Sequence, residues 1–225
     1  MNKEKLKQLA AEKAVEEVHP GMVVGLGTGS TIYYALLKLG EMVREGLDII
    51  GIPTSKGTEK IATEGGIRLS TLGEHPAIDL TIDGADEVNP NLDLIKGLGG
   101  ALVREKIIAH ASKRLIIVAD ESKWVEVLGT KSPLPVEIVQ FGWQATRLAL
   151  NHTGCRSVLR HLNDAPYVSD NGNYILDCHF DAIPNPVQTE LIINNLPGVV
   201  ENGLFVNRAA KVIIGTSSGI QIKER

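Results

Sequence analysis

The chain has 225 residues, of which 43% are hydrophobic and 22% charged, as in soluble globular proteins with room for a main domain and a smaller one. A net charge of −4 argues against nucleic acid or an anionic membrane as a partner. The two cysteines, Cys155 and Cys178, form no CxxC motif and have no pair of histidines nearby, so we expect neither a metal site nor a disulfide. The charged amino-terminal segment lacks the pattern of a signal peptide, and no apolar run approaches the ~18 residues of a membrane span, which predicts a cytoplasmic protein.

Helical and strand patterns alternate over the first half of the chain. Apolar residues at helical spacing predict helices over 3–18, 28–46, 55–66 and 101–112. Short runs rich in β-branched residues predict strands over 22–27, 47–55, 77–86 and 113–122, and a short strand followed by a loop over 67–75. Strands that alternate with helices form βαβ units, so we expect a Rossmann-like α/β domain with a mostly parallel sheet covered on both faces.

From about Pro133 the order of elements changes to strand, helix, strand, hairpin, helix and strand. We expect the hairpin to turn at 170–173 (Asp-Asn-Gly-Asn), between two alternating strands within 167–180. The order β-α-β-β-α-β is that of a ferredoxin-like α+β unit, and residues 209–219 form one more strand that returns to the first sheet. The pattern predicts a main domain of residues 1–130 plus 205–225 and an inserted ferredoxin-like domain of residues 131–204.

Two turns rich in glycine or hydroxyl residues lead from a predicted strand into a predicted helix. In GLGTGST, residues 25–31, glycines end the strand and Thr28, Ser30 and Thr31 stand at the helix start. Backbone N–H groups and the positive end of a helix attract phosphate there. Capping of the helix by a hydroxyl explains the same residues, and at this point both interpretations stay open. In PTSKGTEK, residues 53–60, we favour capping.

Two aspartates follow the strand LTI within IDGADEVNPNLDLIKGLGGALVREKIIA, residues 82–109. Asp83 and Asp86 therefore emerge at the carboxyl edge of the sheet, where open α/β folds bind ligands. Two acids three positions apart can share a site and raise the pKa of one of them, although a polar Asp-Gly turn is the alternative. We expect residues 87–93 to be a solvated connection.

Lys96 and the glycine-rich run 97–100 come next, directly before a predicted helix. The backbone N–H groups of such a run suit an oxyanion, and the lysine adds a fixed charge. On the helix, Glu105 is flanked by apolar residues, while Lys106 and His110 mark a wetter side. A carboxylate in an apolar patch is expected to have a raised pKa, as a general base requires. A solvated glutamate near a helix start is the alternative.

Asp120 and Lys123 follow another strand in the same way. If the strands that end before residues 25, 83 and 120 open on one edge of a sheet, they bring together phosphate-binding turns, acids, lysines and a glutamate. This combination suits proton transfer on a phosphorylated sugar. No Gly-x-Ser-x-Gly motif is present, which disfavours a hydrolase.

The motifs VGLGTGST, IDGADEV, LIKGLGGALVREKIIA, ADESKWVEVLG, PLPVEI, DNGNYILD and LPGVVENGLF resemble, in order and spacing, those of ribose-5-phosphate isomerase type A. The resemblance covers nearly the whole chain. It implies a Rossmann-like domain with an inserted ferredoxin-like domain. It also implies interconversion of ribose 5-phosphate and ribulose 5-phosphate in the non-oxidative pentose phosphate pathway, without metal or organic cofactor, by a homodimer or homotetramer.

The resemblance also assigns roles by position. Glu105 matches the general base, which moves a proton between C2 and C1 through an enediolate. Asp83, Asp86 and Lys96 match groups that open the sugar ring and stabilise the charged intermediate. Residues that match the substrate-binding segments are Thr28, Gly29, Ser30, Thr31, Gly84, Ala85, Gly97, Leu98, Gly99 and Lys123. Lys7 aligns with a phosphate-side lysine of some members.

One residue departs from the family pattern, because Leu98 stands where the second glycine of the run is usual. Leucine resists positive φ, so we expect a change of loop detail with backbone N–H donation kept. Alternative functions on such a scaffold are a sugar-phosphate deaminase, a coenzyme A transferase and a non-catalytic sugar-phosphate sensor. The joint presence of Asp83, Asp86, Lys96 and Glu105 disfavours the sensor.

Overall fold

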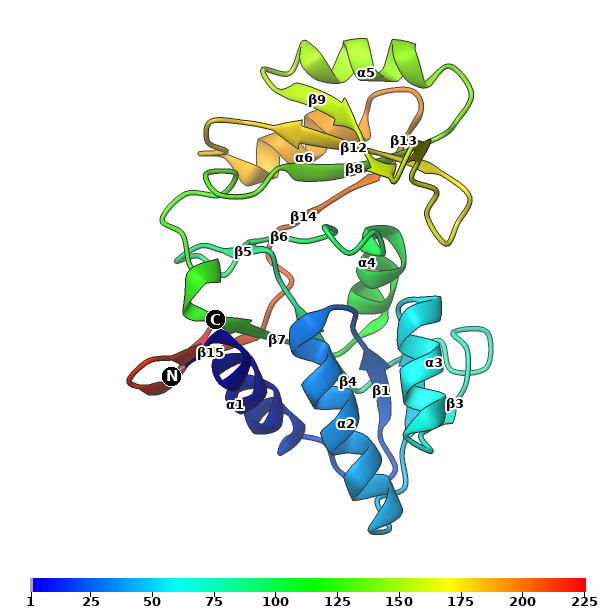
Figure 1. The fold of residues 1–225 in the computed structure, drawn as a ribbon, viewed down its shortest axis with the longest axis vertical. Helices are drawn as coiled ribbons and strands as arrows, with labels where there is room; N and C mark the ends of the chain where they lie inside the picture. Colours follow the sequence, from blue (N-terminus) through cyan, green and yellow to red (C-terminus); the bar gives the residue numbers. More distant parts are fainter. Residues whose placement is uncertain (1) are drawn as a thin grey trace. The chain divides into compact units, whose positions relative to one another are not determined.

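The computed structural model describes residues 2–225, which form two compact units (Figure 1). The first unit contains the chain up to Ala85 together with Arg104–Trp124 and Arg208–Arg225. The second contains Asp86–Val103 and Val125–Asn207. Residues 86–103 thus group with the second unit, although the sequence pattern placed them in the larger domain. The predicted domain boundaries themselves stay a prediction.

A seven-stranded sheet is the framework of the first unit, in the order β16-β15-β7-β4-β1-β2-β3. Every neighbouring pair is parallel except β15 with β16. The strands are β1 Val23–Leu26, β2 Ile50–Pro53, β3 Arg68–Leu69, β4 Leu80–Gly84, β7 Leu115–Asp120, β15 Lys211–Thr216 and β16 Gly219–Glu224. The predicted Rossmann-like, mostly parallel sheet is confirmed, as is the return of the carboxyl-terminal strand to it.

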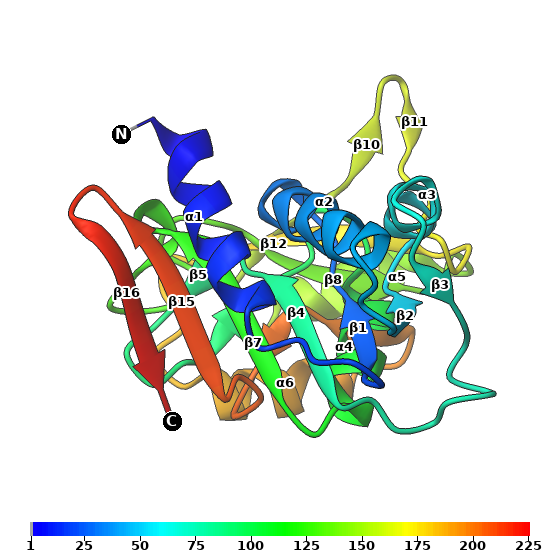
Figure 2. The ribbon, with the colours of Figure 1, turned by 90° about the horizontal axis from the view of Figure 1, so that it is seen from below.

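Different helices cover the two faces of this sheet. They are α1 Lys3–Val15, α2 Ser30–Arg44, α3 Lys56–Glu64 and α4 Leu102–Ala111, whose first two residues group with the second unit. The first three share a core with alternate strand residues such as Val24 and Leu26, and Figure 2 shows α1 and α2 over the strands. On the other face, Ile108 of α4 packs with Ile52 and Ile78.

A four-stranded antiparallel sheet with two helices makes up most of the second unit. Its order is β13-β8-β12-β9, and its elements are β8 Leu134–Ile138, α5 Trp143–Asn151, β9 Arg156–Leu159, β12 Tyr174–His179, α6 Pro186–Asn194 and β13 Val199–Asn202. The predicted ferredoxin-like order of elements is confirmed. Two small sheets complete the unit, one of β5 Glu87–Val88, β6 Leu94–Ile95 and β14 Leu204–Phe205, the other of β10 His161–Leu162 and β11 Ala165–Pro166.

The predicted hairpin around 170–173 is wrong in one strand. Residues 167–169 are not a strand, and β12 pairs with β8 and β9 instead. The buried Glu137 carboxylate accepts hydrogen bonds from Ser169 Oγ at 2.9 Å, Asn171 Nδ2 at 3.1 Å and Asn173 Nδ2 at 2.9 Å. The side chains of this segment thus turn inward to a carboxylate, and its backbone does not extend the ladder.

The predicted solvated connection at 87–93 is also wrong, since only Pro90 and Asn91 in it are exposed. Glu87 is fully buried. Its carboxylate accepts three backbone hydrogen bonds, from the N–H groups of Gly129 at 2.6 Å, Lys131 at 2.7 Å and Ser132 at 2.6 Å. These donors lie more than forty residues further along the chain, so the segment anchors a distant turn.

We expect Glu87→Ala to destabilise the protein by about 2–4 kcal/mol, because it removes a fully buried carboxylate and leaves its three N–H donors without their acceptor. Urea unfolding at neutral pH measures this change. Glu126→Ala is the control, since Glu126 is exposed in the same unit. Equal unfolding free energies for the two variants would contradict this account of Glu87.

Asp79, directly before β4, ties two parts of the first unit together. Its Oδ2 accepts from Val23 N at 2.9 Å, and its Oδ1 accepts from Lys113 Nζ at 2.7 Å. The hydrogen bond from Lys113, followed by that from Val23, lowers the pKa of this carboxyl below its ordinary value of 3.8. A lowered folded-state pKa stabilises the fold above the ordinary value, and this stabilisation is lost as pH falls through the folded-state pKa.

Asp79→Asn should therefore be less stable than the parent at neutral pH, and the difference should shrink as pH falls below about 4. Denaturant unfolding at stepped pH values follows both proteins. Asp164→Asn, at an exposed position, should keep the parental pH dependence. A stability difference between parent and Asp79→Asn that stays constant down to acid pH would refute this role.

Candidate active site

The order in which strands are added to the seven-stranded sheet reverses between β1 and β4. From β1 the chain proceeds to β2 and β3, and it then returns to β4 on the other side of β1. In open parallel sheets, ligands bind outside the carboxyl ends of the strands at such a switch point. Gly27 and Thr28 follow β1 here, and Asp83 lies at the end of β4.

Asp83 is held against the backbone that leaves β1. Its Oδ1 accepts hydrogen bonds from Thr28 N at 3.1 Å and Gly84 N at 2.8 Å, and the residue is 1% exposed. A Cβ at Gly27 would overlap the Asp83 carboxylate. Glycine is thus required for this approach, and backbone N–H donors fix the carboxylate.

The start of α2 presents its amides without a capping side chain. Gly29 is the N-cap with φ 121°, and no side chain among the described residues accepts from the first turn. Thr28 Oγ1 instead lies 2.7 Å from Thr54 Oγ1, 2.8 Å from Ser55 Oγ and 3.0 Å from Thr58 Oγ1. Capping by hydroxyls at 28–31 is therefore wrong, and the geometry suits an anion.

The second strand-to-helix turn behaves as predicted. Ser55 is the N-cap of α3 and its Oγ accepts from Thr58 N at 3.1 Å. Its neighbour Thr54 donates its hydroxyl to Leu26 O at 2.9 Å, and Thr58 Oγ1 donates to Gly27 O at 2.8 Å. This hydroxyl cluster braces the turn after β1, a role that the capping pattern alone did not reveal.

Glu105 lies on the face of α4 that packs on the sheet. One turn further along, a Cβ at Gly25 would come within 2.8 Å of Ile108 Cγ2, and Ser112 Oγ lies 2.7 Å from Thr81 Oγ1. Glu105 is 4% exposed, so its predicted burial is confirmed.

The predicted wetter side of α4 is partly wrong. Lys106 is 4% exposed, whereas Ile107 is 53% exposed and His110 is also exposed. The solvent side of the helix therefore passes through 107 and 110, three residues apart, which is helical spacing. Lys106 lies off that line.

Lys123 ends the short helix η1, Glu121–Lys123, which directly follows β7. Asp120 caps this helix by accepting from Ser122 N at 3.0 Å. The Lys123 side chain is half-buried. Because β7 is parallel to β4 and adjacent to it, Lys123 lies at the same edge of the sheet as Asp83.

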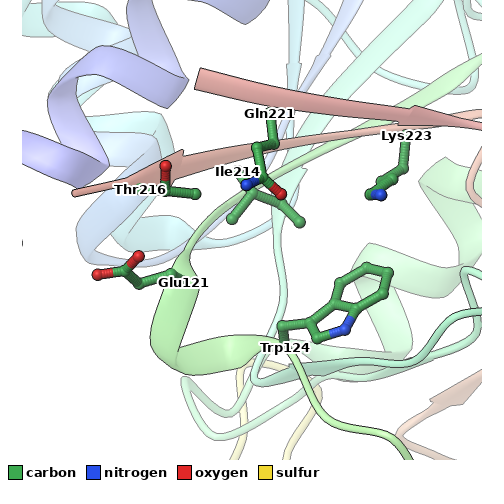
Figure 3. Close-up of a pocket in the computed structure, with 6 residues that line it drawn as sticks. All are labelled: Glu121, Trp124, Ile214, Thr216, Gln221 and Lys223. Atoms are coloured by element: carbon green, nitrogen blue, oxygen red, sulfur yellow. The ribbon is translucent and has the colours of Figure 1, made fainter. Parts of the chain in front are cut away.

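A cavity of about 250 Å³ lies in the first unit beside η1 (Figure 3). Its lining residues are Glu121, Trp124, Ile214, Thr216, Gln221 and Lys223. The Lys223 ammonium lies 5.8 Å from the centroid of the Trp124 ring. None of the predicted site residues is among those that line this cavity.

In the second unit, Asp86 and the glycine-rich run form one local structure. Asp86 Oδ2 accepts from Leu98 N at 2.9 Å, and Gly100 N donates to Gly97 O at 2.9 Å. Gly97 has φ 105° and Gly100 has φ 79°, while Leu98 has no positive φ. Leucine therefore fits at position 98 without backbone strain, and the expected difficulty does not arise.

Lys96 precedes this turn and is 2% exposed. Its backbone N donates to Gly203 O at 2.9 Å, and its ammonium lies 5.4 Å from the centroid of the Phe205 ring. A lysine fixed in this way presents its charge from one defined position.

The predicted site residues divide between the two units. The first unit brings Thr28 and Asp83 into contact, and the second brings Asp86 and Leu98 into contact. The chain passes from the first unit to the second after Ala85 and returns at Arg104. These first two of the four crossings between the units therefore fall within the motifs that carry the predicted chemistry.

Residues 2–225 contain no group of three or more histidine, cysteine, aspartate or glutamate side chains placed to hold a metal ion. Within the same range, no helix is both long and apolar enough to span a bilayer.

Known proteins resemble this chain over nearly its whole length. The family model for ribose 5-phosphate isomerase A (phosphoriboisomerase A) matches residues 50–219. Ribose-5-phosphate isomerase A of Gloeobacter violaceus is 55% identical over 218 residues, which are 96% of this chain and 95% of that protein. The protein of the same name from Bacillus mycoides is 53% identical over 217 residues, which are 96% of this chain and 98% of that protein.

Solved structures agree with these relatives. A D-ribose-5-phosphate isomerase in complex with phospho-erythronic acid matches with a TM-score of 0.98 and 42% identity over 100% of both chains. Ribose 5-phosphate isomerase A from Methanocaldococcus jannaschii matches with a TM-score of 0.95 and 40% identity over 99% of both chains. The chain belongs to the ribose 5-phosphate isomerase A family.

Proposed function

We propose that this protein interconverts D-ribose 5-phosphate and D-ribulose 5-phosphate by general-base proton transfer, with Glu105 as the base. The observation that carries the proposal is the burial of this carboxylate on the helix that packs on the sheet. Thr81 and Asp83 lie two residues apart on β4, so their side chains share one face. Thr81 contacts Ser112, which follows α4, so Asp83 faces the side of the sheet that carries Glu105.

The first step is anchoring of the phosphate group. The uncapped start of α2 at 28–31 supplies backbone N–H groups and a positive dipole end, and Lys123 adds a full positive charge. A related isomerase was solved with phospho-erythronic acid, a phosphorylated sugar acid, which supports a phosphosugar as the ligand here. Gly84 and Ala85, beside Asp83, complete this substrate-binding segment.

The second step is opening of the sugar ring and transfer of the proton. Asp83 and Asp86 are carboxylates fixed by backbone N–H donors, and they assist proton movement at the ring oxygen and hydroxyl. Glu105 takes the proton from C2 and returns it to C1. Lys96 and the amides of Gly97, Leu98 and Gly99 stabilise the negative charge of the enediolate.

The reaction uses neither metal nor organic cofactor, and the protein acts in the cytoplasm as a homodimer or homotetramer. A phosphosugar is its small-molecule partner, in the non-oxidative pentose phosphate pathway. Relatives whose sequences are 55% and 53% identical to this chain are named ribose-5-phosphate isomerase A. Their names disfavour the deaminase, transferase and sensor as alternative functions.

Glu105→Gln should lower kcat by ~10²–10⁴-fold with little change in KM, because the amide cannot accept the C2 proton. A continuous assay of ribulose 5-phosphate formation gives both constants. Glu64→Gln, at an exposed position of α3, should retain parental rates. A Glu105→Gln protein with near-parental kcat would eliminate Glu105 as the base.

Treatment with EDTA should leave kcat and KM unchanged, because side chains and backbone amides supply all of the proposed chemistry. The assay is run before and after dialysis against EDTA, with elemental analysis of the dialysed protein. Loss of activity that added divalent metal restores would rule out the metal-free mechanism.

A further inference from the structure

Arg160, between β9 and β10 of the second unit, joins the ferredoxin-like sheet to the glycine-rich turn. Its Nε and Nη2 donate to the two carboxylate oxygens of Asp177 on β12, at 2.9 and 2.5 Å. Its Nη1 donates to Gly97 O at 3.1 Å and Leu98 O at 3.0 Å. The side chains of Arg160 and Asp177 are only 13% and 19% exposed, so this pair is well shielded from water.

The peptide between Gly97 and Leu98 is held from both sides. Its carbonyl oxygen accepts from Arg160, and its N–H group donates to Asp86 Oδ2. The described chain contains no cis peptide bond, so the C=O and N–H of each peptide unit point in opposite directions. Because Arg160 binds the Gly97 and Leu98 carbonyls, the N–H groups of Leu98 and Gly99 point away from Arg160, and the Leu98 N–H meets Asp86.

We propose that Arg160 is a positioning residue for catalysis, which aligns Asp86 and the amides of the glycine-rich turn through the two carbonyls that it binds. This inference rests on the proposed function, because it assigns Asp86 and these amides to the isomerase reaction. Asp177 in turn fixes the plane of the Arg160 guanidinium, because a bidentate pair with a carboxylate permits only one orientation of that group.

Tyr167 holds the other end of the same turn. A Cβ at Gly100 would overlap the Tyr167 hydroxyl and ring, so the ring lies directly against this glycine. Tyr167 N donates to Arg160 O at 2.9 Å, and the Arg160 guanidinium lies 5.8 Å from the centroid of the ring. Arg160 and Tyr167 flank the β10–β11 hairpin, which stands out in Figure 2. The two residues at the base of this hairpin therefore contact both ends of the glycine-rich turn, Arg160 at Gly97 and Tyr167 at Gly100.

Kinetics of Arg160→Met provide the first test. We expect kcat to fall on the order of 10- to 100-fold, since displaced catalytic groups lose alignment. We expect KM to stay within about threefold, because Arg160 makes no proposed contact with substrate. Arg160→Lys should recover only part of kcat, since an ammonium cannot reproduce the planar fork. Arg156→Met, at an exposed position on β9, is the matched control and should keep parental constants.

A double-mutant cycle shows whether the effect passes through Asp86. Arg160→Met should cost little further activity in an Asp86→Asn background and should keep its full cost in a Lys123→Met background. Equal, multiplicative losses in both backgrounds would overturn the proposal. If Arg160→Met folds poorly, Arg160→Met with Asp177→Asn removes the unbalanced carboxylate and serves in its place.

Amide hydrogen exchange tests the same inference without any assay of activity. The Leu98 N–H should exchange slowly in the parent and about tenfold or more faster in Arg160→Met, with thermal unfolding used to confirm a folded variant. An unchanged Leu98 exchange rate in folded Arg160→Met would overturn the proposal. An inactive parent would refute the proposed function instead, and the exchange result would still decide whether Arg160 fixes the turn.

Discussion

Two glycines, Gly25 on β1 and Gly27 directly after it, determine how the first unit is assembled. Strand residues two apart face the same side, so Gly25 and Gly27 leave one face of the strand end bare while Val24 and Leu26 fill the core on the other. Ile108 of α4 and Thr81 occupy the space at Gly25, and the Asp83 carboxylate occupies the space at Gly27. Any side chain at either position would displace the helix that carries Glu105 or the strand end that carries Asp83.

The same constraint accounts for the polar groups around the switch point. With Asp83 seated against the backbone, Thr28 N is used as its donor, and the Thr28 hydroxyl turns to Thr54, Ser55 and Thr58. The start of α2 therefore keeps its first amides clear of capping side chains among the described residues. A buried carboxylate and an anion-attracting helix start are in this way consequences of one close backbone approach.

The sequence predicts those features that local patterns control. Alternating strand and helix patterns predict the parallel sheet, and the β-α-β-β-α-β order predicts the antiparallel one. The hydroxyl residues at 53–60 predict the capped start of α3, where Ser55 is the N-cap. Patterns do not reveal partners that come from far along the chain. The sequence pattern predicts a solvated Glu87, but its carboxylate binds the amides of Gly129, Lys131 and Ser132. The pattern also predicts a strand at 167–169, but Ser169 donates its hydroxyl to the buried Glu137 carboxylate and the segment does not pair as a strand.

The candidate site shows the same limit. Asp83, Asp86, Lys96 and Glu105 stand out in the sequence because acids and a lysine follow strands and glycines. Arg160 lies more than sixty residues from the carbonyls that it binds, and no local pattern connects it with them. Leu98 shows the converse, since the expected strain at this residue disappears once Gly97 and Gly100 are seen to take the two positive φ values.

Incubation of the purified protein with ribose 5-phosphate in D₂O, followed by NMR, is the decisive test of isomerisation by proton transfer. General-base transfer through an enediolate predicts that ribulose 5-phosphate forms and that the same mixture is reached from either sugar. It also predicts that prolonged incubation places solvent deuterium on the carbons that exchange protons. Failure of the folded protein to interconvert the two sugars, or interconversion that leaves both free of deuterium, would contradict general-base transfer through an enediolate.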